Sequence, residues 1–309
     1  MRGISTQAYN ANTPILDIKT GRAYEESGRL YTAKDIGFPG RPCSWMQNGF
    51  MAVNTTMKAG RVFLWSLYEQ YADWGVDFVK HDCVFGDDLD LDEIKTVSSI
   101  LRIRRQDILY SVSPGTSVTP AMAKNVTELV DMYRISGNVW DLSGDVAAAF
   151  DVARNFAAAN MIGSEGLRGK SWADLDMLPL GWLGYPGSQQ GPYRNSNLNP
   201  DGQRSQMTLW AITKSPLMFG GDVRNLDDAT HNLLTNPMLL EMNSFSTNNK
   251  EFPYATVDGR IRLWIATGRS GEVYVAFFNL NPQMVKVSAQ LSDLAKTLPG
   301  RSFNSCYQV

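Results

Sequence analysis

Residues 74–88 read WGVDFVKHDCVFGDD and set a short apolar strand pattern directly against charged side chains. The apolar part favours a buried strand, and Lys80, His81 and Asp82 follow it at once. Charged groups are seldom buried without partners, so a strand that ends this way indicates a polar edge of the sheet. The same arrangement recurs farther along the chain.

Further strand candidates with apolar centres are separated by helical stretches. They lie at residues 107–113, 129–136, 172–178 and 215–221. The stretches 91–105 and 146–162 carry apolar residues at three- and four-residue spacing, which predicts helices. Strand, helix, strand order predicts parallel pairing. Polar residues end several strand candidates: Lys80, Asp82, Ser111, Ser113, Arg134, Asp174 and Asp176.

This pattern predicts an α/β fold of the (β/α)8 barrel type, in which the carboxyl ends of the strands form one rim that holds the active site. From about residue 245 the pattern changes. The stretches 259–268 and 271–280 alternate apolar and polar residues between turns, which predicts antiparallel sheet. We therefore expect a barrel domain over residues 1–244 and a small β domain over residues 245–309.

The composition excludes several classes of partner. The chain has 29 basic and 31 acidic residues in 309, a net charge of −2, which gives no footprint for nucleic acid or an anionic membrane. Its apolar runs are shorter than a membrane span requires. The three cysteines and two histidines match no zinc spacing, so we predict no metal and no cofactor. A neutral ligand fits this balance, and the oligomeric state stays open.

Four blocks of sequence together resemble a known family. WGVDFVKHDC (74–83), MYRISGNVWD (132–141), WADLDMLPLG (172–181) and the long block 206–243 are similar to the α-galactosidase (melibiase) group, glycoside hydrolase family 27. Within this family the chain resembles the plant and bacterial branch that includes β-L-arabinopyranosidases. The resemblance implies a retaining hydrolase that removes terminal α-galactosyl or β-L-arabinopyranosyl residues through a covalent glycosyl-enzyme intermediate, acting on a galactose-like oligosaccharide or glycoconjugate.

The resemblance also implies roles for single residues. Asp82 matches the family nucleophile, and Lys80, two residues earlier on the same strand face, favours its ionised form. Arg134 and Asp176 match residues that bind the sugar, and Ser113 stands where many members have a sugar-contacting glutamate. The alternative for the charged residues is an ordinary solvated rim with casual ion pairs.

One position departs from the family pattern. Asn138 stands where the family has the aspartate that acts as general acid and base, and an amide cannot donate that proton. Asp141, three residues on, is a candidate substitute, although we expect it deeper in the loop. The departure leaves two functions open: a hydrolase with weak acid catalysis, or a sugar-binding pseudoenzyme.

Three further expectations follow from the resemblance. Residues 1–5 resemble the end of the third barrel strand, so the first two strands and part of the C-terminal domain are expected to be missing from this chain. Cys43 and Cys83 match a family cysteine pair and are expected to form a disulfide, although Cys83 stands one residue earlier than usual. The family implies a secreted or a vacuolar or lysosomal location, which the chain itself leaves unknown.

Overall fold

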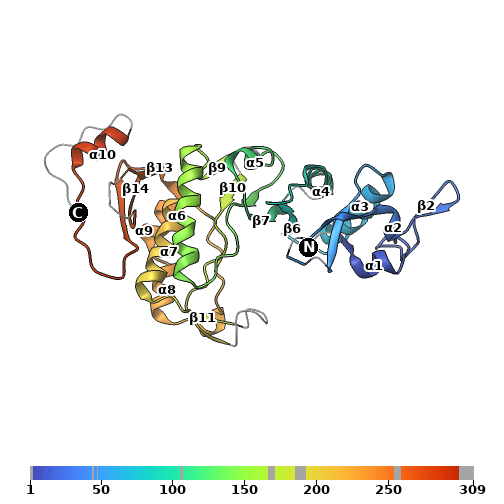
Figure 1. The fold of residues 1–309 in the computed structure, drawn as a ribbon, viewed down its shortest axis with the longest axis horizontal. Helices are drawn as coiled ribbons and strands as arrows, with labels where there is room; N and C mark the ends of the chain where they lie inside the picture. The colour runs from blue at the N-terminus through green and yellow to red at the C-terminus, as the bar shows by residue number, and fades with distance from the viewer. Residues whose placement is uncertain are drawn as a thin grey trace. The chain divides into compact units, whose positions relative to one another are not determined.

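The computed structural model describes residues 3–43, 45–46, 48–104, 107–165, 171–184, 193–253 and 259–298 (Figure 1). The chain forms two compact units. The first unit comprises Met1–Gly137 and Ser164–Asp174, and the second comprises Asn138–Gly163 and Leu175–Val309. This division does not follow the boundary expected after residue 244, because helices before that point contact the C-terminal sheet. The boundary after residue 244 stays a prediction about domains.

A sheet with four parallel strands forms the centre of the first unit. These strands are β6 (Phe78–Phe85), β7 (Leu109–Pro114), β8 (Met132–Arg134) and β10 (Ser171–Asp174). They pair in the order β6-β7-β8-β10, and the short β9 (Ser164–Glu165) adds to β10 antiparallel. The parallel strands expected within residues 74–88, 107–113, 129–136 and 172–178 are therefore confirmed.

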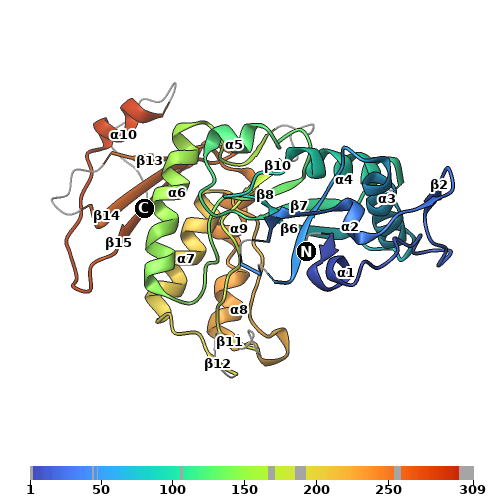
Figure 2. The same ribbon diagram turned by 45° about the vertical axis from the view of Figure 1, so that its right-hand side comes forward.

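Two long helices of the first unit pack against each other beside this sheet (Figure 2). They are α3 (Lys58–Asp73) and α4 (Leu91–Arg104), and the short α5 (Pro120–Lys124) follows β7. Helix α4 begins with acidic residues and ends with basic ones, which suits the helix dipole. Its residues Ile94, Val97 and Leu101 are buried at the spacing predicted from the sequence.

The described residues between 3 and 57 form small elements, most of which the sequence did not indicate. These are β1 (Ile4–Ser5), α1 (Thr6–Asn10), β2 (Glu25–Glu26), β3 (Arg29–Leu30), α2 (Ala33–Ile36), β4 (Gly37–Pro42) and β5 (Phe50–Val53). Strands β1, β5 and β4 make an antiparallel sheet. Strand β1 thus pairs antiparallel with β5, and its place as a barrel strand stays a prediction.

The second unit combines helices with an antiparallel sheet. Its longer elements are α6 (Ser143–Ala158), α7 (Pro200–Ile212), α9 (Pro237–Phe245), β13 (Thr247–Phe252), β14 (Ile261–Thr267) and β15 (Val273–Asn279). The sheet order β13-β14-β15 confirms the predicted change to antiparallel pairing. The shorter elements are β11 (Trp182–Leu183), β12 (Arg194–Asn195), the 3-10 turn η1 (Val223–Asn225), α8 (Asp228–Leu234) and α10 (Leu291–Thr297).

One predicted strand is absent in the second unit. Residues 215–221 make only an isolated parallel bridge, in which Phe219 pairs with Leu178. Pro216 lacks an amide hydrogen, and the glycines at 220 and 221 favour turns over strands, so the apolar stretch does not extend into a ladder. The expectation of a full strand over residues 215–221 is wrong for the described structure.

Buried aromatic side chains mark the core of each unit. Phe85 and Tyr133 meet edge to face in the first unit, with ring centroids 6.2 Å apart. In the second unit Trp210, Trp264 and Phe150 are fully buried. The α/β class with a parallel sheet followed by an antiparallel one is thus confirmed, while closure into an eight-stranded barrel stays a prediction. No helix among the described residues is long and apolar enough to cross a membrane.

Candidate active site at the ends of the parallel strands

Three of the predicted site residues lie at the carboxyl ends of adjacent strands in the first unit. Asp82 lies in the last part of β6, Ser113 near the end of β7, and Arg134 at the end of β8. The register pairs His81 with Val112, so Asp82 and Ser113 directly follow paired residues. Parallel strand ends meet at one edge of a sheet, and this edge is therefore polar, as the sequence predicted.

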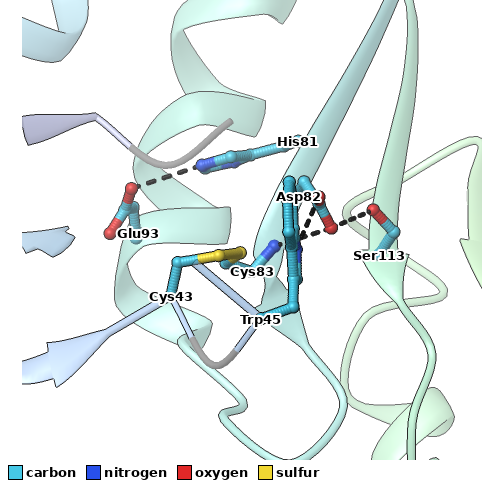
Figure 3. Close-up of a disulfide and its surroundings, with 7 residues drawn as sticks. All are labelled: Cys43, Trp45, His81, Asp82, Cys83, Glu93 and Ser113. Atoms are coloured by element: carbon cyan, nitrogen blue, oxygen red, sulfur yellow. Dashed lines mark hydrogen bonds and ion pairs between the residues drawn. A yellow bond between two sulfur atoms is a disulfide. The ribbon is translucent and has the colours of Figure 1, made fainter. Parts of the chain in front are cut away.

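The carboxylate of Asp82 accepts hydrogen bonds on both oxygens (Figure 3). The hydroxyl of Ser113 donates to Oδ1 at 2.7 Å, and the backbone N–H of Cys83 donates to the same atom at 3.0 Å. The indole N–H of Trp45 donates to Oδ2 at 3.0 Å. Three donors around one carboxylate fix its orientation.

A disulfide holds the segment that carries Trp45 beside the strand that carries Asp82. Cys43 and Cys83 are bonded, with their Cα atoms 5.2 Å apart, as the family resemblance implied. Cys83 has φ of +67°, a conformation that non-glycine residues seldom adopt. This turn interrupts the regular ladder between β6 and β7 just after His81. Such outliers are concentrated at functional sites, where the surroundings hold them in place.

Lys80 lies on the strand that the sequence predicted for it. It lies two residues before Asp82 on β6, so both side chains project from the same face of the strand, and Lys80 is exposed. Its role as a sugar-binding residue stays a prediction.

Arg134 is buried and is held by backbone carbonyls. Its Nε–H donates to the carbonyl oxygens of Pro114 and Ser136, which joins the end of β8 to the end of β7. Gly115 lies between these strand ends with φ of +81°, and a Cβ there would collide with the carbonyl oxygens of Ser136 and Arg134. The close approach of the two strand ends therefore requires glycine at position 115.

A buried polar cluster lies behind Asp82 and was not predicted from the sequence. His81 points to the opposite side of β6 from Asp82, toward Glu93 on α4 (Figure 3). Its Nε2 lies 3.2 Å from Oε1 of Glu93, and its Nδ1 lies 2.9 Å from the hydroxyl of Tyr110. Burial, with Tyr68 and Glu93 nearby, raises the pKa of Tyr110 well above its usual value. The protonated phenol can therefore donate to Nδ1, which leaves the Nε2–H facing Glu93.

Two other predicted site residues belong to the second unit. Asn138 is exposed, in the loop before α6. Asp176 is buried, and its Oδ2 accepts the backbone N–H of Val139 at 2.9 Å, which fixes the loop next to Asn138. Asp176 also has φ of +81°, a second outlier at a predicted site residue. Trp210 donates its indole N–H to the Asp176 carbonyl at 2.8 Å.

Asp141, the candidate substitute from the sequence, is unsuited to act as a general acid. Its side chain is buried and faces Arg194, whose Nη1 and Nη2 both donate to the carboxylate, the latter at 3.0 Å. The backbone N–H of Asn197 donates to Oδ2 at 2.6 Å. Burial by itself raises the pKa of Asp141, but these donors outweigh it and hold the pKa below its usual value. A carboxyl that stays ionised cannot supply a proton to a leaving group.

The structure therefore brings together Asp82, Ser113 and Arg134 on neighbouring strands of the first unit, with Lys80 on the same strand as Asp82. Asn138 and Asp176 come together in the second unit, and their placement around one sugar stays a prediction. Among the described residues no group of three His, Cys, Asp or Glu side chains is placed to hold a metal ion. The sequence analysis missed Trp45 because its hydrogen bond to Asp82 joins residues 37 positions apart. The expected disulfide of Cys43, two residues before Trp45, was the signal that could have placed it near Asp82.

Comparison with known proteins relates these features to a family. Residues 65–244 match the family model described as alpha galactosidase A. An alpha-galactosidase of Schizosaccharomyces pombe is 23% identical over 73% of this chain and 54% of its own length. The chain thus spans about half the length of that curated relative.

Solved structures match a larger part of the chain. A family 27 β-L-arabinopyranosidase from Geobacillus stearothermophilus superimposes with a TM-score of 0.80 and 31% identity, covering 95% of this chain and 63% of that one. A variant of the same enzyme, solved in complex with arabinose, matches with a TM-score of 0.78 and 30% identity, over 95% of this chain and 64% of that one.

Proposed function

Because this chain belongs to the alpha galactosidase A family, glycoside hydrolase family 27, we propose that it acts on a terminal galactose-like sugar. The curated relative is named an alpha-galactosidase, and the solved relative a β-L-arabinopyranosidase. Their sugars share the ring configuration and differ in the hydroxymethyl group at C6. The shared part is the substrate class that we propose, and the reaction is retaining hydrolysis of its glycosidic bond.

The observation that carries this proposal is the arrangement of Asp82. Its carboxylate lies at the polar edge of the parallel sheet and is oriented by Ser113, by the Cys83 N–H and by Trp45. A glycosidase nucleophile must be ionised and aimed before the sugar arrives, because reaction depends on the alignment of the attacking oxygen with the anomeric carbon. Hydrogen bonds from three donors aim the Asp82 carboxylate before the sugar arrives.

The proposed reaction has two steps. Asp82 attacks the anomeric carbon, the bond to the leaving oxygen breaks, and a glycosyl ester forms; water then cleaves the ester and restores the carboxylate. Retaining enzymes place a second carboxyl group about 5 to 5.5 Å from the nucleophile to protonate the leaving oxygen. The residue that matches this position is Asn138, which has no such proton to give. We therefore propose that the rate of hydrolysis is high only for substrates whose leaving group departs without a proton.

Sugar recognition in this proposal falls to groups with fixed partners. Arg134, buried at the end of β8, and Asp176 are proposed to bind sugar hydroxyls, with Lys80 at the exposed face of β6. Ser113 already donates to Asp82, so we assign it to holding the nucleophile as well as to the wall of the sugar site. A buried group left unpaired by a wrong sugar costs about 1 to 3 kcal/mol, which supplies selectivity.

A second candidate function is a sugar-binding protein without natural turnover. Two observations around the proposed acid position favour it: Asn138 is an amide, and Asp141 is held ionised by Arg194. The binding residues need not change in such a protein. A substrate whose leaving group needs no acid distinguishes the two candidates, because the hydrolase cleaves it and the binding protein only binds it.

A leaving-group comparison separates the two. Dinitrophenolate departs without a proton, so a hydrolase with a working Asp82 cleaves dinitrophenyl α-galactoside and the matching β-L-arabinopyranoside but leaves methyl galactoside nearly untouched. Asp82→Asn abolishes this cleavage, whereas Asp87→Asn, at an exposed position on the loop after β6, leaves it unchanged. Sugar binding without cleavage of either dinitrophenyl glycoside indicates the binding protein. Absence of both binding and cleavage refutes the proposal.

The compartment is also part of the proposal. A disulfide persists in oxidising compartments and is rare in the cytosol, and Cys43–Cys83 forms one. This supports a secreted or a vacuolar or lysosomal location for the protein.

A further inference from the structure

The two oxygens of the Asp82 carboxylate have different kinds of partners. Oδ1 accepts from Ser113, a side chain only 1% exposed, and from a backbone N–H. Among the described residues, the donor to Oδ2 is Trp45, whose side chain is 54% exposed. Oδ1 is therefore held by rigid parts of the sheet, and Oδ2 by a side chain at the surface.

This difference identifies the oxygen that can react. The attacking oxygen must give up a lone pair to the anomeric carbon, so it needs a partner that can leave. The Cys83 N–H is part of the backbone of β6 and cannot leave without disturbing that strand, and Ser113 is buried at the end of β7, where water cannot replace its hydroxyl. The indole of Trp45 can leave by rotation of its own side chain, because the ring is mostly in solvent.

We propose that Trp45 is a gate on the nucleophile: it covers Oδ2 of Asp82 in the free protein and turns aside when the sugar binds. The inference rests on the proposed function and adds a specificity-determining residue to it. The ring that turns aside presents a flat apolar face to the pyranose, whose C–H bonds pack well on an aromatic ring. The gate thus exchanges one polar contact for one apolar contact.

The bond changes follow from this assignment. Oδ2 forms the bond to the anomeric carbon while the bond between that carbon and the leaving oxygen breaks. The leaving oxygen takes the electron pair of the broken bond. Oδ1 becomes the carbonyl oxygen of the glycosyl ester and keeps the hydrogen bonds from Ser113 and Cys83. Water then attacks the anomeric carbon, one proton passes to solvent, and the Asp82 carboxylate is released with Oδ2 free for Trp45.

The disulfide keeps Trp45 close to Asp82 while the gate opens and closes. Trp45 lies two residues after Cys43, and Cys43 is bonded to Cys83, the neighbour of Asp82 (Figure 3). The bond limits how far the indole can travel from the carboxylate. The ring therefore returns to Oδ2 when the sugar departs, and its position over the site is defined in both states.

Two substitutions separate the polar and apolar parts of the gate. Trp45→Phe removes the N–H and keeps a ring, so galactose or arabinose no longer has to displace a hydrogen bond. We expect its dissociation constant to fall about threefold to tenfold. Trp45→Ala also removes the ring, and we expect roughly threefold to tenfold weaker binding than in the Phe variant. Trp74→Phe, at a 68% exposed tryptophan that ends α3, is the matched control and leaves affinity unchanged.

The decisive readout is the indole N–H resonance of Trp45 in a ¹⁵N-labelled full chain, assigned by its loss in Trp45→Phe. We expect it to shift in Asp82→Asn, and to shift when galactose or arabinose saturates the wild-type protein. Bound sugar with an unmoved Trp45 resonance, or a Phe variant that binds as weakly as the Ala variant, overturns the gate alone. Failure of both wild type and Trp45→Phe to bind either sugar overturns the gate together with the proposed function, and the Asp82→Asn shift then still records the contact.

Discussion

The hydroxyl of Ser113 donates a 2.7 Å hydrogen bond to Oδ1 of Asp82 and so joins the ends of two adjacent parallel strands. The serine is buried, so this donor is not exchanged for water. Oδ1 of the carboxylate is therefore held by the sheet itself rather than by a loop. Position 113, where the family resemblance implies a sugar-contacting glutamate in many members, is a serine that contacts the proposed nucleophile.

Removing this hydroxyl is expected to impair the first chemical step. A hydrogen bond to a charged group is worth about 1.5 to 3 kcal/mol, and its loss lets the Asp82 carboxylate turn away from the anomeric carbon. We expect Ser113→Ala to lower the rate of dinitrophenolate release about tenfold to a hundredfold, measured before steady state. Ser99→Ala, at an exposed serine of α4, should leave the rate unchanged. An unaltered rate in Ser113→Ala would show that Asp82 needs no such support.

Restoring the acid is the second prediction. General acid help contributes about 10² to 10⁴ in rate, so Asn138→Asp should raise the hydrolysis of methyl galactoside by a factor in that range. Cleavage of the dinitrophenyl glycoside should change little, because that leaving group needs no proton. The ratio of the two rates, measured for wild type and variant, is the test. Equal gains on both substrates would mean that residue 138 acts on something other than the leaving group.

The Asp141–Arg194 pair predicts a pH-dependent contribution to stability. The pKa of Asp141 lies below its usual value in the folded state, so its stabilisation is fully present above the unfolded value of about 3.9. It is lost as the pH falls through the folded pKa. We expect Asp141→Asn to lower the free energy of unfolding by about 1 to 3 kcal/mol at pH 7, with a shrinking difference from wild type in strong acid.

The control for this prediction is another aspartate with an arginine partner. Asp201 pairs with Arg204 on the surface of α7, where the aspartate side chain is 84% exposed. Exposed pairs contribute about 0 to 1 kcal/mol, so Asp201→Asn should change the urea midpoint little. Similar losses in both variants would show that burial of Asp141 adds nothing.

The disulfide predicts a change in stability as well as in the site. Cys43 and Cys83 are 40 residues apart, and closing a loop of that length stabilises the folded state by about 4 kcal/mol in the chain-entropy model. We expect the double variant Cys43→Ser, Cys83→Ser to lose about 2 to 4 kcal/mol in urea unfolding. Labelling of Cys43 or Cys83 by alkylation without reductant would contradict the pairing.

Much of the first unit could be predicted because its signals are local. The strands that carry Asp82, Ser113 and Arg134 are apolar stretches with polar ends, and parallel pairing follows from the helices between them. The antiparallel sheet after residue 245 was equally clear from alternation. Strand order then brings the polar ends to one edge without any knowledge of tertiary contacts.

The parts that were missed depend on contacts between distant residues. Strand β4 runs through Gly37–Pro42, whose glycines and prolines argue against a strand, and only its pairing with β5 reveals it. Trp45 meets Asp82 across 37 residues, and Glu93 reaches His81 from the neighbouring helix. For residues 215–221 the error is the opposite one: the apolar residues predict a strand that does not form. Pro216 and the two glycines prevent its ladder of hydrogen bonds.

Covalent trapping of the nucleophile tests the central claim most directly. A galactosyl donor with a ring fluorine and a dinitrophenolate leaving group forms the glycosyl ester quickly and hydrolyses it slowly, so the ester can be mapped by mass spectrometry of peptides. The proposed mechanism predicts one sugar per chain, attached to the peptide that contains Asp82, and no adduct in Asp82→Asn. A sugar attached to a different carboxylate, or release of dinitrophenolate by a chain that never forms an adduct, would contradict it.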